Sequence, residues 1–90
     1  MLASYLDHVD APEIDYRAEL PPHRQIAAWI FARIENGELQ PGQPLESEKD
    51  LMDTFGVART TARRAVAYLR ETGAIRTVPG RGSYVAERPG

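Results

Sequence analysis

The 90-residue sequence predicts a small α+β fold, mainly helical, in which three helices precede a two-stranded β hairpin. Apolar residues recur at helical spacing between residues 23 and 36, and two further helical stretches are separated by a short turn around a glycine. The C-terminal part alternates polar and apolar residues on both sides of a glycine-rich loop. Because a chain of this length can bury only one hydrophobic core, we expect a single domain.

The first helix is expected from His23 to Asn36, with Pro22 in its first turn, where the missing proline N–H leaves no hydrogen bond unmade. Its apolar stripe repeats every four residues and consists of Ile26, Ile30 and Ile34. Trp29 and Phe31 lie about 100° to either side of that stripe. The buried face of this helix is therefore expected to be wide.

A turn is expected between residues 41 and 44, where two prolines and a glycine interrupt the helical pattern. The second helix should begin at Ser47, whose hydroxyl can accept from the Asp50 amide while the Asp50 carboxylate reaches back. Gly56 is suited to the left-handed conformation that ends a helix. This short helix is expected to bury Leu51 and Phe55.

The third helix is expected from Ala58 to Thr72, only about three residues after the second, which predicts a helix-turn-helix. At about 100° per residue, one arc of the helical wheel is apolar and must face the core. That arc contains Ala58, Ala62, Ala65, Val66 and Leu69. The opposite arc is mostly polar and contains Arg59, Thr60, Arg63, Arg64, Ala67 and Glu71.

Two short alternating runs, residues 74–78 and 83–87, flank the loop from Pro79 to Gly82 and predict a two-stranded hairpin. A helix-turn-helix followed by such a hairpin is a winged helix-turn-helix. We therefore divide the chain into an N-terminal extension, residues 1–20, and one winged helix-turn-helix domain, residues 21–88.

The overall net charge of −2 conceals two regions of opposite sign. Residues 1–20 carry five acidic residues against one arginine, a net charge of −4. Residues 59–88 carry seven arginines against two glutamates, a net charge of +5. Because the local field attracts phosphate, the basic half is the expected partner of nucleic acid.

Several classes of protein are excluded or disfavoured by composition. The chain has no cysteine, which rules out disulfides and zinc-finger ligation by thiolates. No apolar run approaches the roughly 20 residues needed to cross a bilayer, and no secretory signal is present, so we expect a cytoplasmic, nucleoid-associated protein with no membrane partner. His8 and His23 have no metal-ligating or nucleophilic residues at meaningful spacing, so we expect neither an enzyme nor a cofactor.

The polar arc of the third helix is the expected contact with double-stranded DNA. Arginine pairs with the acceptors on the edge of guanine and also binds phosphate, and the small Ala67 allows close approach to a groove. Arg59 opens the helix, where a positive charge opposes the helix dipole, so helix stability does not account for it. Arg81, between Gly80 and Gly82, suits a narrow minor groove.

The sequence resembles the DNA-binding domain of the GntR family of bacterial repressors. The matching stretches run in register over about residues 21–86 and include 36–39, 45–51, 55–57, 59–65 and 79–85. The resemblance implies contacts to bases and phosphates by Lys49, Arg59, Thr60, Thr61, Arg63, Gly80, Arg81 and Gly82. It also reveals two departures, since the family often has Ser or Thr where Ala58 stands and usually has proline where Glu46 stands.

The resemblance further implies a sequence-specific transcriptional regulator, a repressor, with residues 58–71 in the major groove and the wing, residues 79–83, at the minor groove. A palindromic operator and a homodimer are the expected partners. Family members usually append a domain that binds a small molecule, whereas this sequence ends at Gly90 with no evident effector domain.

An alternative interpretation is a winged-helix module that binds another protein through a surface at Trp29 and Phe31. The same two rings can instead pack beneath the N-terminal extension or take part in dimerisation.

Overall fold

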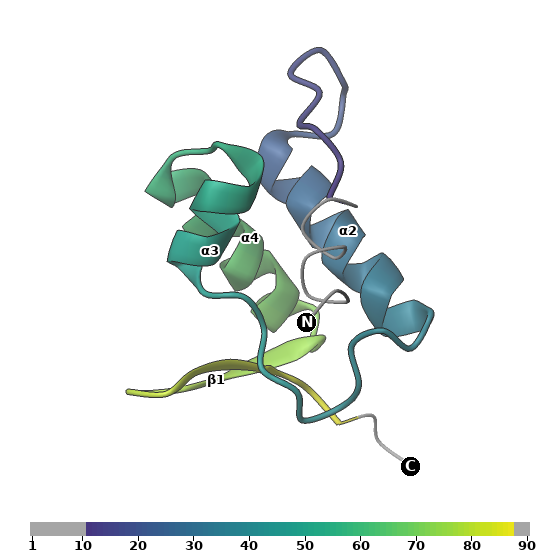
Figure 1. Ribbon diagram of the computed structural model, residues 1–90, viewed down its shortest axis with the longest axis vertical. Coiled ribbons are helices and arrows are strands. Elements are labelled where there is room, and N and C mark those ends of the chain that lie inside the picture. The colour runs from purple at the N-terminus through teal and green to yellow at the C-terminus, as the bar shows by residue number, and fades with distance from the viewer. Residues whose placement is uncertain (1–10, 88–90) are drawn as a thin grey trace.

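The computed structural model describes residues 11–87. Within them lie α2 (Pro22–Glu35), α3 (Glu48–Phe55) and α4 (Arg59–Glu71), followed by strands β1 (Ile75–Val78) and β2 (Gly82–Val85). Helix α4 packs against both α2 and α3, and the hairpin lies below the helices in Figure 1. The predicted winged helix-turn-helix is confirmed, and every predicted boundary is within two residues of the observed one.

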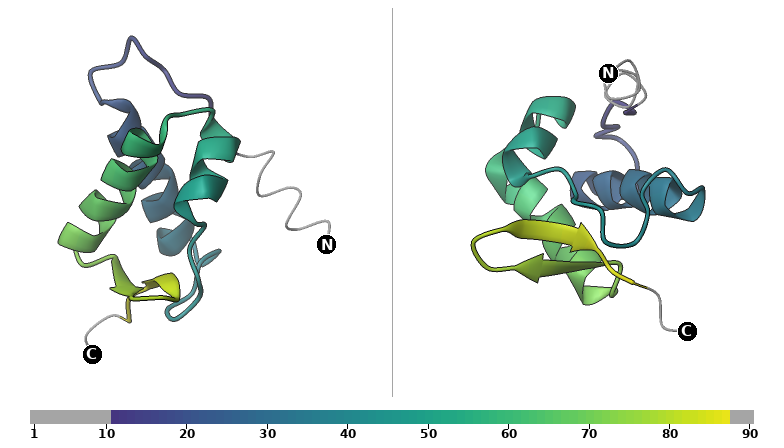
Figure 2. Two further views of the ribbon diagram at one scale, coloured as in Figure 1. Left: turned by 90° about the vertical axis from the view of Figure 1, so that its left-hand side faces the viewer. Right: turned by 60° about the horizontal axis from the view of Figure 1, so that its bottom comes forward.

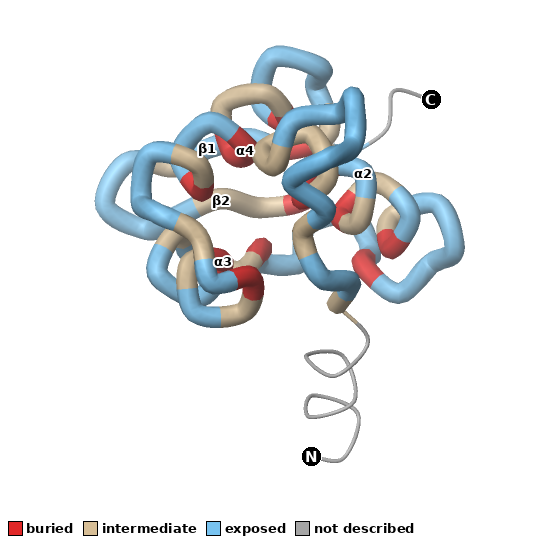
Figure 3. The backbone as a smooth tube through the Cα atoms, turned by 90° about the horizontal axis from the view of Figure 1, so that it is seen from above, coloured by how far each residue is buried: buried red, intermediate tan, exposed pale blue. Residues whose placement is uncertain are grey.

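The core is formed where the three helices meet the base of the hairpin (Figure 3). Its fully buried large side chains are Ile26, Ile30, Leu51, Leu69 and Val85. On α4 the predicted apolar arc is buried except for Ala58, which is exposed. Ala58 is the N-cap residue and has extended backbone angles, φ −70° and ψ 159°, so the helical wheel does not describe its direction.

Both ends of α3 have the predicted geometry. The Asp50 amide donates to Ser47 Oγ at 3.0 Å, and the Ser47 amide donates to Asp50 Oδ2 at 3.2 Å, which completes a capping box. At the other end Gly56 has φ +64° and ψ 38°, the left-handed conformation that turns the chain toward α4. The tight turn between α3 and α4 therefore follows from local sequence.

A buried ion pair joins α2 to the segment before α3. Arg33 is only 7 % exposed, and its Nη1 donates to Glu46 Oε2 at 2.8 Å. The guanidinium also lies over the Trp29 ring, 4.2 Å from its centroid. Glu46 thus serves as the partner of a buried arginine.

The hairpin is extended by a short contact with the segment that precedes α3. Strands β1 and β2 pair antiparallel, with Thr77 opposite Ser83. On the other edge of β2, Pro44 forms an isolated bridge with Tyr84, and the Leu45 amide donates to the Ser83 carbonyl at 2.9 Å. These bonds fix the start of α3 to the hairpin, whose closed end projects away from the helices (Figure 2).

The N-terminal extension is described only from residue 11 onward, and its first ten residues lie outside the described part. The Gln25 side chain holds the described part through bonds to the Asp15 amide, the Asp15 carbonyl and the Leu20 carbonyl, all between 2.7 and 2.9 Å. Ala11 and Ile14 pack against the core. Packing of the extension over Trp29 and Phe31 was one of the sequence-based alternatives, but Ala11 and Ile14 were not identified as the residues involved.

Candidate nucleic-acid interface

The exposed face of α4 carries a row of three arginines. On the helical wheel Arg59, Arg70 and Arg63 fall within about 40° of one another. All three are exposed, while the opposite face of the helix is buried in the core. The row begins at the first residue of α4 and continues into its last turn.

Arg70 is a member of this row that the sequence analysis did not include. Its Nη1 donates to Thr77 Oγ1 on β1 at 3.2 Å, and Thr77 Oγ1 lies 3.1 Å from Ser83 Oγ on β2. The signal was present in the sequence, since Arg70 follows Arg63 by seven residues, which is two helical turns. Its contact with the hairpin, by contrast, depends on the tertiary structure.

A groove of about 390 Å³ lies between the N-terminus of α3, the exposed row of α4 and the hairpin. We call it the wing groove. The side chains and backbone that line it include Lys49, Arg59, Arg70, Thr77, Gly82 and Ser83. The structure thus brings together three of the predicted contact residues, Lys49, Arg59 and Gly82, from three separate elements.

Two of the predicted basic contacts have carboxylate neighbours at the surface. Lys49 Nζ lies 3.2 Å from Asp53 Oδ2, and both side chains are largely exposed. Arg63 Nε lies 3.9 Å from Glu48 Oε1, again with both side chains in contact with solvent. Exposed pairs of this kind contribute at most about 1 kcal/mol, so both cations remain able to exchange their partner for a phosphate.

Thr61 and Arg64 lie on other sides of α4. Thr61 is half-buried, although its neighbour Thr60 is exposed. Arg64 faces the beginning of α2, where burial, followed by the charges of Arg64 and Arg24, lowers the pKa of His23 below 6.5. The structure therefore does not bring Arg64 into the lining of the wing groove with Arg59.

The tip of the hairpin is a tight turn. The Arg81 amide donates to the Val78 carbonyl at 2.9 Å, and Gly80 has φ +78°. With Pro79 before that glycine, the turn has the sequence and geometry of type II. Arg81 is exposed at the tip, and no atom of residues 11–87 comes within 4 Å of a Cβ placed at Gly80, so the backbone there is open to close approach.

The two aromatic residues of the alternative interpretation are half-buried inside the domain. Trp29 packs edge-on against Phe55 of α3 with ring centroids 5.2 Å apart, and Phe31 packs edge-on against Tyr68 of α4 at 6.3 Å. Among the described residues, the exposed large apolar side chains are Tyr16 and Leu20 of the extension. An interaction surface centred on Trp29 and Phe31 is not favoured.

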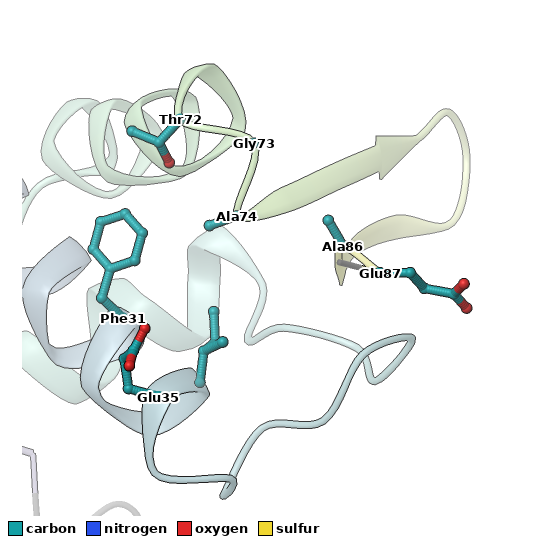
Figure 4. A pocket seen from close by; sticks show the side chains of 8 residues that line it. Phe31, Glu35, Thr72, Gly73, Ala74, Ala86 and Glu87 are labelled. Carbon is teal, nitrogen blue, oxygen red and sulfur yellow. The ribbon is translucent and has the colours of Figure 1, made fainter. Parts of the chain in front are cut away.

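A smaller hollow of about 220 Å³ lies at the C-terminal ends of α2 and α4 (Figure 4). Phe31, Ala74 and Ala86 contribute apolar surface to it, and Glu35 and Glu87 add carboxylates. Among residues 11–87, no basic residue lines it, so this described lining does not suit phosphate. Residues 11–87 also contain no helix able to span a membrane and no cluster of three potential metal ligands.

Comparison with known proteins matches the part of the chain that contains the three helices and the hairpin. A family model described as bacterial regulatory proteins, gntR family, matches residues 20–85. The transcriptional repressor NagR of Bacillus subtilis is 36 % identical over 74 residues, which cover 82 % of this chain. The mannosyl-D-glycerate transport/metabolism system repressor MngR of Escherichia coli is 43 % identical over 67 residues, or 74 % of this chain.

The fold is also similar to solved structures of DNA-binding domains. The DNA-binding domain of AraR, in complex with operator ORX1, superposes with a TM-score of 0.76 at 33 % identity and covers 83 % of this chain and 95 % of that chain. The matched regions amount to 30 % of NagR and 28 % of MngR. The present chain therefore spans less than a third of the length of these two relatives.

Proposed function

The chain belongs to the gntR family of bacterial regulatory proteins, and we propose on this basis that it regulates transcription by binding specific DNA sequences. The observation that carries the proposal is the exposed arginine row of α4, which begins at the helix N-terminus beside the wing groove. In this proposal α4 enters the major groove and the hairpin, hereafter the wing, reaches the adjacent minor groove. The site works by binding alone and includes no catalytic step.

Arg59 and Arg63 are the proposed readers of base edges. Both are exposed within the first two turns of α4, the end of a recognition helix that lies deepest in the major groove. A guanidinium can donate two hydrogen bonds to guanine O6 and N7, a pairing that is worth about 1–3 kcal/mol of discrimination. Thr60, beside Arg59, is proposed to contact a base or the backbone.

Phosphate contacts are proposed for Lys49 on α3 and for Thr61 and Arg64 on α4, which lie outside the arginine row. Lys49 lies in the first turn of α3, where the helix dipole also favours an anion. In the wing, Arg81 is proposed to enter the minor groove, and Gly80 and Gly82 to allow the backbone to approach the DNA closely.

Repression and paired binding are further parts of the proposal. Both NagR and MngR are repressors, and the AraR domain was solved on an operator. We propose that two copies bind the half-sites of a palindromic operator, and that the protein acts in the cytoplasm on nucleoid DNA. Pairing would supply the affinity that the few phosphate contacts of a single domain do not.

Selection of duplexes from a random pool, followed by binding measurements on the selected sequence, tests this function. Arg59→Ala with Arg63→Ala should abolish binding to that duplex while leaving the circular dichroism spectrum unchanged and the thermal midpoint no lower than that of the wild type. The matched control, Arg17→Ala with Arg24→Ala, removes the same charge and should retain binding. Undiminished binding by the folded Arg59/Arg63 double variant would contradict the assignment.

Repression is tested separately in a reporter assay. With the selected sequence placed over a promoter, the wild-type protein should lower expression, and the Arg59/Arg63 double variant should leave it unchanged. A rise in expression would show activation instead. If no duplex is selected but added proteins shift the amide resonances, the protein-binding alternative would be favoured.

A further inference from the structure

We propose that Arg70, together with Thr77 and Ser83, binds a phosphodiester of the DNA strand that crosses the wing groove between α4 and the wing. This inference rests on the proposed function. It adds a contact to the sugar-phosphate strand that separates the major groove from the minor groove. It assigns a role to the part of the arginine row that lies beyond the reach of base edges.

The position of Arg70 along α4 favours the backbone over the bases. Arg70 follows Arg59 by eleven residues, which separates their backbones by about 16 Å along the helix axis. The major groove of B-form DNA is only about 8.5 Å deep. In the proposed orientation, with the N-terminus of α4 against the base edges and the helix axis directed out of the groove, the last turn of the helix is level with the sugar-phosphate backbone.

The charges around the wing groove leave Arg70 available to an anion. Of the carboxylates in its lining, Glu46 is paired with the buried Arg33 at 2.8 Å and Glu48 faces Arg63 at 3.9 Å. Among residues 11–87, no carboxylate lies within 4.0 Å of the guanidinium of Arg59 or Arg70. Two cations therefore line the groove without an anionic partner in the described part of the chain.

The hydrogen-bonding groups beside Arg70 are suited to a phosphate oxygen. A guanidinium has five N–H donors, and Thr77 accepts from one of them. The Thr77 and Ser83 hydroxyls lie opposite each other in the strand register, 3.1 Å apart, so one donates to the other and one O–H is left for a further acceptor. Arg70, Thr77 and Ser83 thus present unused donors from adjoining elements.

The groove is held open by the protein's own backbone. The Leu45 amide donates to the Ser83 carbonyl, and the Val85 amide donates to the Gln43 carbonyl, so the segment before α3 is paired with β2. The Arg70 side chain joins α4 to β1 on the other side. Because these bonds join parts of the protein to one another, they do not have to be made by the phosphate, and little ordering is required when it binds.

The test measures the salt dependence of binding to the selected duplex. Each phosphate contact that releases a counterion contributes about 0.9 to the slope of log K against log salt. Arg70→Met should lower the slope by about 0.9 and weaken binding, whereas Arg70→Lys, which keeps the charge, should retain most of the slope. Arg24→Met is the matched control, since Arg24 lies over the Tyr68 ring, and its slope should equal that of the wild type.

A purely structural role for Arg70 predicts different effects of substitution on affinity and salt dependence. Thr77→Val removes the hydroxyl that Arg70 holds within the protein but keeps the charge, so the proposal predicts an unchanged salt slope. If Arg70→Met and Thr77→Val weaken binding equally and neither changes the slope, Arg70 only positions the wing and the inference is overturned. Ethylation interference should also identify one phosphate required by the wild type and not by Arg70→Met.

Failure of this inference is distinguishable from failure of the proposed function. If the wild type binds the selected duplex and Arg59→Ala with Arg63→Ala abolishes binding, while Arg70→Met matches the wild type in affinity and slope, only the Arg70 contact is wrong. If the wild type binds no duplex at any salt concentration, both proposals are wrong.

Discussion

Individual side chains show how one substitution changes the chemistry around it. At position 46, where the resemblance to the GntR family leads us to expect proline, this chain has a glutamate that is paired with the buried Arg33. Arg33 Nε and Glu46 Oε1 are buried without a hydrogen-bond partner in the described residues. A pair that is only partly satisfied costs desolvation energy, so its main effect is to make each charge depend on the other.

Arg33→Met should therefore lower the free energy of unfolding by about 3 kcal/mol, because the Glu46 carboxylate is left buried without its cation. Adding Glu46→Gln should recover part of that loss, with a coupling energy of about 1–3 kcal/mol. Urea unfolding followed by the fluorescence of Trp29, the only tryptophan, measures both variants. Strict additivity of the two substitutions would show that the pair is not coupled.

His23 makes the free energy of unfolding depend on pH, and the direction of that dependence follows from its pKa. Burial and the nearby Arg64 and Arg24 lower its pKa in the folded protein below 6.5, so the unfolded state binds a proton more readily. The stabilising contribution of neutral His23 is present above pH 6.5 and is lost as the pH falls through the folded pKa. Between about pH 7.5 and pH 5, denaturant unfolding should show that the free energy of unfolding falls less in His23→Gln than in the wild type. Equal losses would contradict the shift.

At the scale of elements, the two helices of the helix-turn-helix begin differently. The first, α3, has only eight residues and begins with a complete capping box at Ser47. The second, α4, begins at Ala58, whose side chain accepts no hydrogen bond, and an arginine follows at once. Both the missing cap and the unfavourable interaction of Arg59 with the helix dipole weaken the start of α4. The start of α4, which is proposed to contact DNA, is therefore less well stabilised than the start of α3.

Substitution of the two N-caps should shift stability in opposite directions. Ala58→Ser should raise the free energy of unfolding by about 0.5–1 kcal/mol, because the backbone already has N-cap geometry. Ser47→Ala should lower it by about 1 kcal/mol, because α3 loses the bond to the Asp50 amide. Thermal or denaturant unfolding measures both. An unchanged midpoint for Ala58→Ser would show that α4 gains nothing from a cap.

The whole molecule places the surface proposed to contact DNA on a small core. Helix α4 is buried on one side by α2 and α3, and the wing is attached both to α4 through Arg70 and to the segment before α3 through Ser83. The described part of the N-terminal extension is held by Gln25 at the beginning of α2 through its bonds to the Asp15 and Leu20 carbonyls. The wing groove gathers Lys49, Arg59 and Arg70 on one face, and this local concentration of positive charge is why a net acidic chain remains compatible with DNA binding.

Paired binding on a palindrome predicts a strict dependence on half-site spacing. Two copies of α4 that enter the major groove on the same side of the duplex require half-site centres about 10 bp apart, or a multiple of that spacing. Insertion of about 5 bp between the half-sites should abolish cooperative binding, and insertion of about 10 bp should preserve the common face. Analytical ultracentrifugation with the selected duplex measures the stoichiometry. A single bound copy, unaffected by spacing, would contradict the proposed pairing.

Sequence by itself determined the local features of this protein. The capping box at Ser47, the left-handed Gly56 and the apolar stripe of α2 depend on residues a few positions apart, and they predicted the order and type of every element. The arginine row of α4 follows from helical periodicity in the same way. The motifs that resemble the GntR family are likewise contiguous, so family membership was accessible from the sequence.

Only the tertiary structure decided which distant residues meet. The pairing of Arg33 with Glu46, the contact of Arg70 with Thr77 and the packing of Ala11 and Ile14 join separate elements. Helical and strand periodicity show which side of an element is polar, but they do not show what lies opposite it. For that reason the sequence predicted a basic surface on α4, and the structure alone revealed the wing groove beside it.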